Sequence, residues 1–151
     1  MKILAVEDDP SVLAVTQNRL EIAGYEVITA TEGLEGLNKA RSENPDLILL
    51  DLKLPNLNGY QISWMLKRDM KYRHIPIIML TSLTEEKDII EGFRAGADFY
   101  ITKPYEADAL LNQIKTLLEQ RPKKRPEPQA PAPKKKPKKL VKTKKRKPKG
   151  K

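Results

Sequence analysis

The sequence has no cysteine and only one histidine, His74, among its 151 residues. The lack of cysteine excludes disulfide bonds, thiolate metal sites and a cysteine nucleophile, and a lone histidine excludes a multi-histidine metal centre. Long apolar runs are also missing. The N-terminal run, Ile3–Val6, is too short for a signal peptide, and no stretch approaches the roughly 18 apolar residues of a membrane span. We therefore expect a soluble, cytoplasmic protein.

Negative charge is almost absent from the end of the chain. Residues 121–151 contain sixteen of the 29 Lys and Arg residues, seven of the twelve prolines and a single acid, Glu127, which gives this segment a net charge of +15. Residues 1–120 hold 13 basic and 19 acidic residues, a net charge of −6. We expect one globular domain over residues 1–120. The basic tail over residues 121–151 should be disordered, because it buries too little apolar surface to offset its chain entropy.

Five short apolar runs alternate with segments of helical periodicity. In the last helical segment, for example, Leu110, Ile114 and Leu118 recur at four-residue intervals and form one apolar stripe. Alternating strands and helices imply right-handed crossovers and a parallel sheet with helices on both faces. The sequence therefore predicts a three-layer α/β domain with five strands and five helices. The strand-length runs are Ile3–Val6, Val27–Ala30, Leu47–Leu50, Ile75–Leu80 and Phe99–Ile101.

Polar residues follow the carboxyl ends of these predicted strands, where open parallel sheets bind their ligands. Carboxylates at close range repel one another, which favours a bound Mg²⁺ held by one or two of them. Asp51 is the best placed to act as a nucleophile and form an aspartyl phosphate. A lysine and a threonine would then contact phosphoryl oxygens. The residues concerned are Glu7, Asp8 and Asp9 after the first strand, Asp51 after the third, Thr81 after the fourth and Lys103 after the fifth.

The first of these acidic clusters also has a local structural interpretation. Asp9 stands before Pro10, and an aspartate followed by proline is typical of a helix N-cap with proline at the first helical position. Taken alone, an Asp-Asp pair before a helix is more often a cap than a metal site. The joint placement of all the polar residues at one sheet edge is what favours a common site.

Together these motifs resemble the receiver domain of bacterial two-component response regulators, of the chemotaxis-regulator type. The resemblance covers about residues 1–120 and implies a flavodoxin-like, doubly wound (βα)5 fold with a five-stranded parallel sheet. The spacing from Asp51 through Pro55 to Gly59 is its most specific element. The other matching motifs are Val6-Glu7-Asp8-Asp9, Leu80-Thr81-Ser82, Ala95-Gly96-Ala97-Asp98 and Tyr100-Ile101-Thr102-Lys103-Pro104.

The resemblance assigns a role to each site residue. Asp51 is implied to be the phosphoacceptor, and a cis peptide bond is implied between Lys103 and Pro104. The implied Mg²⁺ ligands are Asp9, Asp51 and the backbone carbonyl of Lys53, with Asp8 acting through water. The implied phosphate-binding and switch residues are Lys103, the hydroxyl of Thr81 and the aromatic side chain of Tyr100.

The function implied by the resemblance is that of a phosphorylation-switched response regulator in a phosphorelay. It would accept a phosphoryl group from a sensor histidine kinase or a histidine phosphotransfer protein. It would not be an enzyme, beyond self-phosphorylation from small donors and autodephosphorylation. Because the sequence has no output domain, its output would pass through protein contacts or the tail, and a phosphorylation-dependent dimer is a further expectation.

Three other functions compete with this interpretation. A phosphatase of the haloacid-dehalogenase type would need a second acid two residues after Asp51, where this chain has Lys53. A flavodoxin-like cofactor binder would suffer repulsion between the cofactor phosphate and the three acids after the first strand. The last alternative is an architectural nucleic-acid-binding protein acting through the tail, associated with the nucleoid. The charge of the tail fits DNA, anionic lipid or an acidic protein surface, and is also compatible with no partner.

Overall fold

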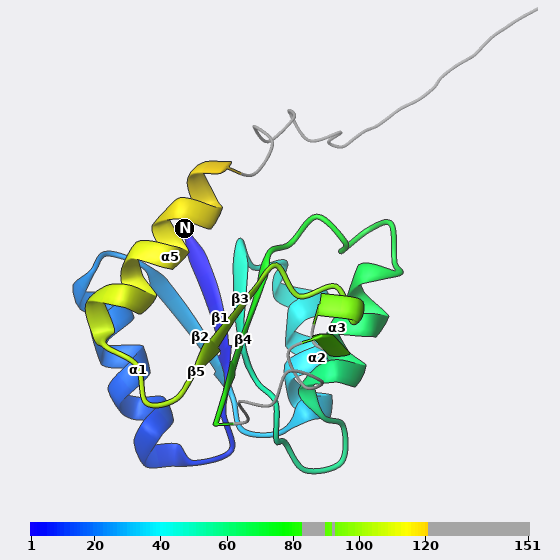
Figure 1. Ribbon diagram of the computed structural model, residues 1–151, viewed down its shortest axis with the longest axis horizontal. Coiled ribbons are helices and arrows are strands. Elements are labelled where there is room, and N and C mark those ends of the chain that lie inside the picture. The colour runs from blue at the N-terminus through cyan, green and yellow to red at the C-terminus, as the bar shows by residue number, and fades with distance from the viewer. Residues whose placement is uncertain (83–89, 92, 121–151) are drawn as a thin grey trace, which may run out of the picture. The chain divides into compact units, whose positions relative to one another are not determined.

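The computed structural model describes residues 1–82, 90–91 and 93–120. Five parallel strands form a single sheet in the order β2-β1-β3-β4-β5 (Figure 1). The central strands β3 and β4 are buried along their whole length, as expected for strands covered on both faces. The strands are β1 (Lys2–Val6), β2 (Glu26–Ala30), β3 (Leu47–Asp51), β4 (Ile77–Thr81) and β5 (Phe99–Thr102).

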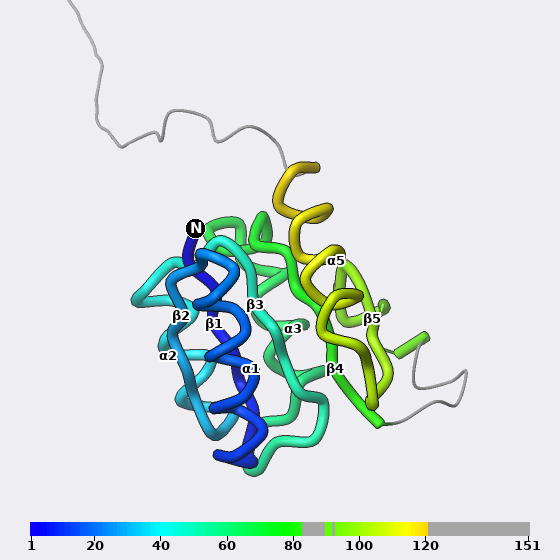
Figure 2. The backbone as a smooth tube through the Cα atoms, turned by 90° about the vertical axis from the view of Figure 1, so that its left-hand side faces the viewer, coloured from blue at the N-terminus to red at the C-terminus, as the bar shows by residue number. Residues whose placement is uncertain are grey.

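Helices cover both faces of this sheet. Helices α1 and α5 lie on one face and α2 and α3 on the other, as Figures 1 and 2 show. None of the described helices combines the length and apolar composition that a membrane span requires. The helices are α1 (Pro10–Ile22), α2 (Gly33–Glu43), α3 (Gly59–Lys67) and α5 (Ala107–Gln120).

The fourth predicted helix and the tail fall largely on residues outside the described part of the chain. Of the fourth helix, residues 90, 91, 93 and 94 are described, and all four are helical. The tail over residues 121–151 is not described at all, so its disorder stays a prediction.

The sheet separates two apolar cores, one under each helical layer. Leu4, Leu50 and Met79 point into the core beneath α2 and α3. Their strand neighbours Ala5 and Leu49 point into the core beneath α1 and α5. Adjacent residues of a strand face opposite sides of a sheet, so each central strand contributes to both cores. The predicted α/β fold and its parallel sheet are confirmed.

The start of α3 is held tightly behind the end of β3. The Asn58 side chain accepts a hydrogen bond from the backbone N–H of Gln61, and the Gln61 side chain accepts one from the N–H of Asn58, which completes a capping box. Gly59 donates its N–H to the carbonyl of Leu52 at 3.0 Å. A Cβ at position 59 would lie 2.7 Å from the carbonyl oxygen of Asp51. Only glycine permits this approach, which fixes the backbone beneath Asp51.

Gly59→Ala is expected to lower the free energy of unfolding by about 1–3 kcal/mol, because the new methyl group would meet backbone atoms that have no rotamer to change. Urea denaturation measures the effect. Asn38→Ala, an exposed change on α2, should stay within about 0.5 kcal/mol of the parent protein. Equal stability of the two variants would contradict the close packing at Gly59.

Candidate functional site

The strand order brings together the strand ends that carry the predicted site. Strand β1 pairs with β3, β3 with β4 and β4 with β5, so the carboxyl ends of these four strands lie side by side. Asp51 ends β3 and is only 7% exposed, and Thr81 ends β4 and is buried. The backbone N–H of Lys103 donates to the carbonyl of Thr81 at 2.7 Å. This bond places the lysine at the same edge as the aspartate.

Three carboxylates and one ammonium converge there. Glu7, Asp8 and Asp51 each have a carboxylate oxygen within 4.8 Å of the other two. The Nζ of Lys103 donates to Oε1 of Glu7 at 2.8 Å and lies 3.7 Å from Oδ2 of Asp51. One ammonium therefore faces three carboxylates, an imbalance of charge that a further cation would reduce.

The protonation equilibria reflect this imbalance. Burial raises the pKa of Asp51 to about 6, the negative charge of Glu7 adds to the rise, and Lys103 opposes it. Burial, together with a hydrogen bond to Glu7 and its charge, also raises the pKa of Asp8. For Glu7, the hydrogen bonds from Lys103 and from the N–H of Asp9 outweigh the effect of burial, and the pKa of Glu7 is lowered. Glu7 and Lys103 thus form the ion pair, while Asp51 is left incompletely neutralised.

Lys103 remains a cation in this setting. Burial alone would lower the pKa of Lys103, but its hydrogen bond to Glu7 and the charges of Asp51 and Glu7 outweigh this and raise it. The ammonium is therefore held charged beside the Asp51 carboxylate.

The structure places Asp9 at the start of α1. Asp9 caps α1: its Oδ1 accepts hydrogen bonds from the N–H of Ser11 at 2.9 Å and from the Ser11 hydroxyl at 2.7 Å. These bonds lower the pKa of Asp9. Its carboxylate is exposed and is not among the three that converge. Asp8 and Glu7, which follow β1, are the acids that face Asp51 in the described structure. The expectation that Asp9 and Asp51 bind the metal directly, with Asp8 acting through water, therefore gains no support from this geometry and stays a prediction.

The remaining predicted residues take positions consistent with their assignment. The Lys103–Pro104 peptide bond is cis, as predicted. Tyr100 is half-buried on β5 and packs against the core beneath α2 and α3. The N–H of Lys53 donates to the Asp51 carboxylate, which places Lys53 in the loop beside the aspartate. Its carbonyl stays a predicted ligand.

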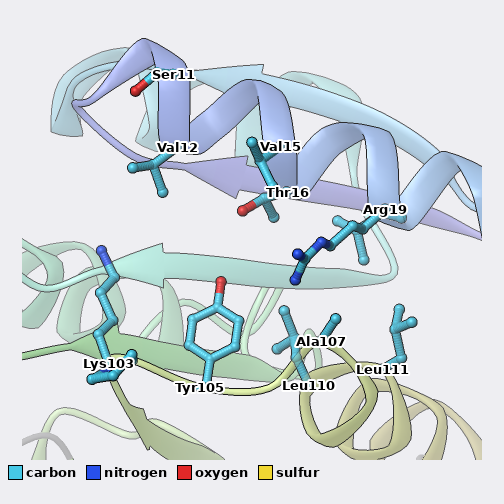
Figure 3. Close-up of a pocket in the computed structure, with 12 residues that line it drawn as sticks. Ser11, Val12, Val15, Thr16, Arg19, Lys103, Tyr105, Ala107, Leu110 and Leu111 are labelled. Carbon is cyan, nitrogen blue, oxygen red and sulfur yellow. The ribbon is translucent and has the colours of Figure 1, made fainter.

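An apolar groove opens next to this cluster, between α1 and the start of α5 (Figure 3). Its volume is about 460 Å³. Val12, Val15 and Thr16 form the α1 wall, and Tyr105 and Leu111 lie on the opposite wall. Lys103 also lines the groove, so the groove and the acidic cluster share a residue.

The comparisons with known proteins agree with this geometry. The profile of the response regulator receiver domain matches residues 3–115. The chain belongs to this family. It is therefore a receiver domain of the two-component response regulators over most of its described length.

Individual relatives extend the comparison. The chain is 40% identical over 119 residues to the DNA-binding dual master transcriptional regulator RpaA of Synechocystis, which covers 79% of this chain and 49% of RpaA. It is 38% identical over 117 residues to protein PilH of Pseudomonas aeruginosa, covering 78% of this chain and 97% of PilH. The chain spans about half the length of several curated relatives that it matches, RpaA among them.

A solved structure bears on the acidic cluster. The receiver domain of the sensor histidine kinase PA1611 of Pseudomonas aeruginosa has a TM-score of 0.74 and 29% identity, and covers 79% of this chain and 98% of that one. That receiver domain was crystallised with a magnesium ion coordinated in its active-site cleft.

The raised pKa of Asp51 makes stability depend on pH in the metal-free protein. Between about pH 4, the ordinary aspartate pKa, and about pH 6, the folded chain holds more protons at Asp51 than the unfolded chain, so stability falls as pH rises. Asp51→Asn removes the charge. At about pH 7.5 it should stabilise the fold by about 1–2 kcal/mol, allowing for screening by nearby solvent. At about pH 4.5 the gain should be much smaller.

Urea denaturation in the presence of a chelator measures this difference. Asn38→Ala, an exposed change on α2 that alters no titratable group, should show no comparable difference between the two pH values. A stabilisation by Asp51→Asn that is the same at both pH values would mean that Asp51 is not held at a raised pKa.

Proposed function

We propose that this receiver domain accepts a phosphoryl group on Asp51 from a histidine donor, a sensor kinase or a phosphotransfer protein. The observation that carries the proposal is the position of Asp51 beside the Glu7–Lys103 ion pair, at the edge where four strand ends meet. Its carboxylate is almost buried and only partly neutralised, so it is oriented by the fold and not paired fully with a cation. A free carboxylate oxygen is what the transfer requires.

The transfer itself needs little covalent chemistry from the protein. A carboxylate oxygen of Asp51 attacks the phosphorus of a phosphohistidine, the P–O bond forms as the P–N bond breaks, and the imidazole departs with the electron pair. Lys103 stands 3.7 Å from Asp51 and would donate to a phosphoryl oxygen. The Thr81 hydroxyl, buried at the end of the adjacent strand, would donate to another. Positioning and charge neutralisation of this kind account for most catalysis of phosphoryl transfer.

The acidic cluster fits Mg²⁺. Three carboxylates with oxygens within 4.8 Å of one another are a hard-oxygen donor set, and Asp8 and Asp51 have raised pKa values that a cation would lower. Asp8 and Asp51 would supply the carboxylate ligands, with the Lys53 carbonyl as a further oxygen. When bound, the ion would neutralise these acids and bind a phosphoryl oxygen. Glu7 is committed to Lys103 and would act through it.

The apolar groove beside the cluster supports docking of the donor. A phosphohistidine must reach Asp51 from outside, and the groove between α1 and α5 offers exposed aliphatic surface next to Lys103, with Val15 52% exposed. A helix of a donor protein lying in this groove would present its histidine toward Asp51. Aliphatic contact would supply affinity without placing further charge beside the acids.

Three variants test the site together. With a small phosphodonor and Mg²⁺, the parent protein should gain one phosphoryl group by intact mass, and Asp51→Asn should gain none. Asp8→Ala should lose nearly all labelling, because a direct ligand is removed. Asp9→Ala should still be labelled but lose about 1 kcal/mol of stability with its helix cap.

This pair of neighbours separates the two assignments of the metal ligand. Labelling lost in Asp9→Ala but kept in Asp8→Ala would restore the register expected from the sequence alone. A phosphoryl adduct persisting in Asp51→Asn would mean that another residue is the acceptor.

The basic tail supports a second, independent activity. Residues 121–151 carry a net charge of +15, lie beyond the receiver domain profile, and would bind a polyanion through counterion release. We propose duplex DNA as the ligand, contacted along its backbone without base readout, because lysine outnumbers arginine in the tail. Association with the nucleoid would follow from it. A phosphorylation-dependent dimer stays a prediction of the family resemblance.

Salt dependence tests the role of the tail. If about six to ten phosphates are contacted, affinity for a labelled duplex should fall by roughly 10³–10⁵ between about 50 and 200 mM salt. Fluorescence anisotropy measures it, with a chain ending at Gln120 as the control that should not bind. An affinity for the duplex that does not change with salt concentration, or that is the same without the tail, would rule this activity out.

A further inference from the structure

A second groove lies on the other helical layer, along α3, and the proposed phosphoryl transfer does not use it. Trp64, the only tryptophan of the chain, is half exposed there. Together with Leu57, Tyr60 and Met65 it forms one wall, and Glu91, Arg94 and Ala95 lie on the other. The groove has a volume of about 500 Å³. Neither Asp51 nor Lys103 lines it.

The apolar wall follows a helical stripe. Tyr60 and Trp64 are four residues apart on α3, so they lie one above the other, and Leu57, just before the helix, extends the same apolar wall. Met65 sits beside Trp64 and supplies a flexible side chain that can adjust to different occupants. Leu57 and Trp64 are seven residues apart in the sequence. That matches the anchors at i, i+3 or i+4 and i+7 by which a partner helix occupies a groove.

Two arginines flank this apolar wall. The guanidinium of Arg68 stacks over the Trp64 ring, 4.3 Å from its centroid, and Arg94 projects from the opposite wall. Stacking uses the face of the guanidinium and leaves its N–H groups available as donors. Within the described part of the chain, no carboxylate forms an ion pair with either arginine. By contrast, the adjacent Lys67 is paired with Asp98 at 2.9 Å.

The charge at this groove is opposite to that of the domain. Residues 1–120 have a net charge of −6, yet the described residues at the groove include two guanidinium groups, Arg94 in its lining and Arg68 stacked on Trp64, and one acid, Glu91. A partner that carries carboxylates around an apolar stripe would satisfy both features. Nucleic acid would not, because Glu91 would repel its phosphates and the apolar wall would stay uncovered.

We propose that the groove binds an acidic amphipathic helix of a partner protein, with aliphatic side chains against Trp64 and carboxylates paired with Arg68 and Arg94. The site is independent of Asp51 chemistry, so it is an interaction surface in addition to the phosphoacceptor. Its occupant is defined by chemistry: leucine-like anchors at helical spacing, flanked by aspartate or glutamate.

The emission of Trp64 gives a local readout in the full chain, since no other tryptophan contributes. The probe is a synthetic helical peptide of about 15 residues with leucine at i, i+3, i+4 and i+7 and glutamate on both flanks. Binding should shift the Trp64 emission to shorter wavelength, saturably, at physiological salt. The matched peptide with lysine for glutamate should bind at least about tenfold more weakly, since like charges meet across the interface.

Charge reversals in the protein locate the contact. Arg68→Glu and Arg94→Glu should each weaken binding of the glutamate peptide by about five- to tenfold, and Arg68→Glu should bind the lysine peptide better than the parent does. Lys115→Glu makes the same change in net charge at an exposed position on α5. It should leave affinity within about twofold. All variants keep the basic tail, so any attraction of the peptide to the tail contributes equally to each measured affinity.

Three results would overturn the proposal. Trp64 emission that does not respond to the glutamate peptide would show that the groove is not a docking site. An equal loss of affinity in Lys115→Glu would reduce the binding to net charge alone. A random duplex DNA that shifts Trp64 emission while the glutamate peptide does not would assign the surface to nucleic acid.

Discussion

The site depends on one electrostatic constraint: a single ammonium, that of Lys103, faces the carboxylates of Glu7, Asp8 and Asp51. Glu7 lies 96 residues from Lys103 in the sequence, and only the folded sheet brings them to 2.8 Å. The lysine is closer to Glu7 than to Asp51, so its charge is neutralised mainly by Glu7, which follows β1. Asp51 is left with a pKa raised to about 6. An incompletely neutralised carboxylate can bind a cation and can act as a nucleophile, and full pairing would weaken both capacities.

The backbone around Asp51 is fixed by close packing in the same loop. Gly59 begins α3 directly against the carbonyl of Asp51, and the Asn58 cap fixes the helix entry. Gly33, the first residue of α2, also packs against this loop, where a Cβ would overlap the backbone carbonyl of Leu57. The first residues of α2 and α3 are therefore packed so closely against the loop after β3 that neither position has space for a Cβ. These backbone contacts hold Asp51 in place, in addition to its electrostatic interactions with Glu7 and Lys103.

The sequence was enough to predict the sheet and the identity of most site residues. Apolar runs of strand length indicate the strands, and the polar residues that follow them mark the carboxyl edge of the sheet, where the site lies. The first acidic cluster shows where the sequence is ambiguous. Three acids follow β1, and the family resemblance implies Asp9 as a direct ligand and Asp8 as acting through water. The Asp9-Pro10 cap signal, present in the same segment, already committed the Asp9 oxygen to the helix N-terminus. The helix cap thus leaves Glu7 and Asp8 as the acids that face Asp51.

The exposure of Trp64 could not be predicted from its apolar neighbours, because α3 buries Ile62 and Leu66 on its opposite side.

The two grooves lie on opposite helical layers of the sheet, and this separation has a consequence for a switch. A donor in the groove between α1 and α5 contacts residues of those helices and Lys103, whereas a partner along α3 contacts none of them. The two grooves have no lining residue in common. Any influence between them must then pass through the sheet. Strands β4 and β5 are linked by the hydrogen bond from the N–H of Lys103 to the carbonyl of Thr81 and by the strand pairing that continues to Phe99. Glu91, Arg94 and Ala95, which line the far wall of the α3 groove, lie between β4 and β5 in the sequence. A coupling that runs through these two strands would need no contact between the two bound proteins.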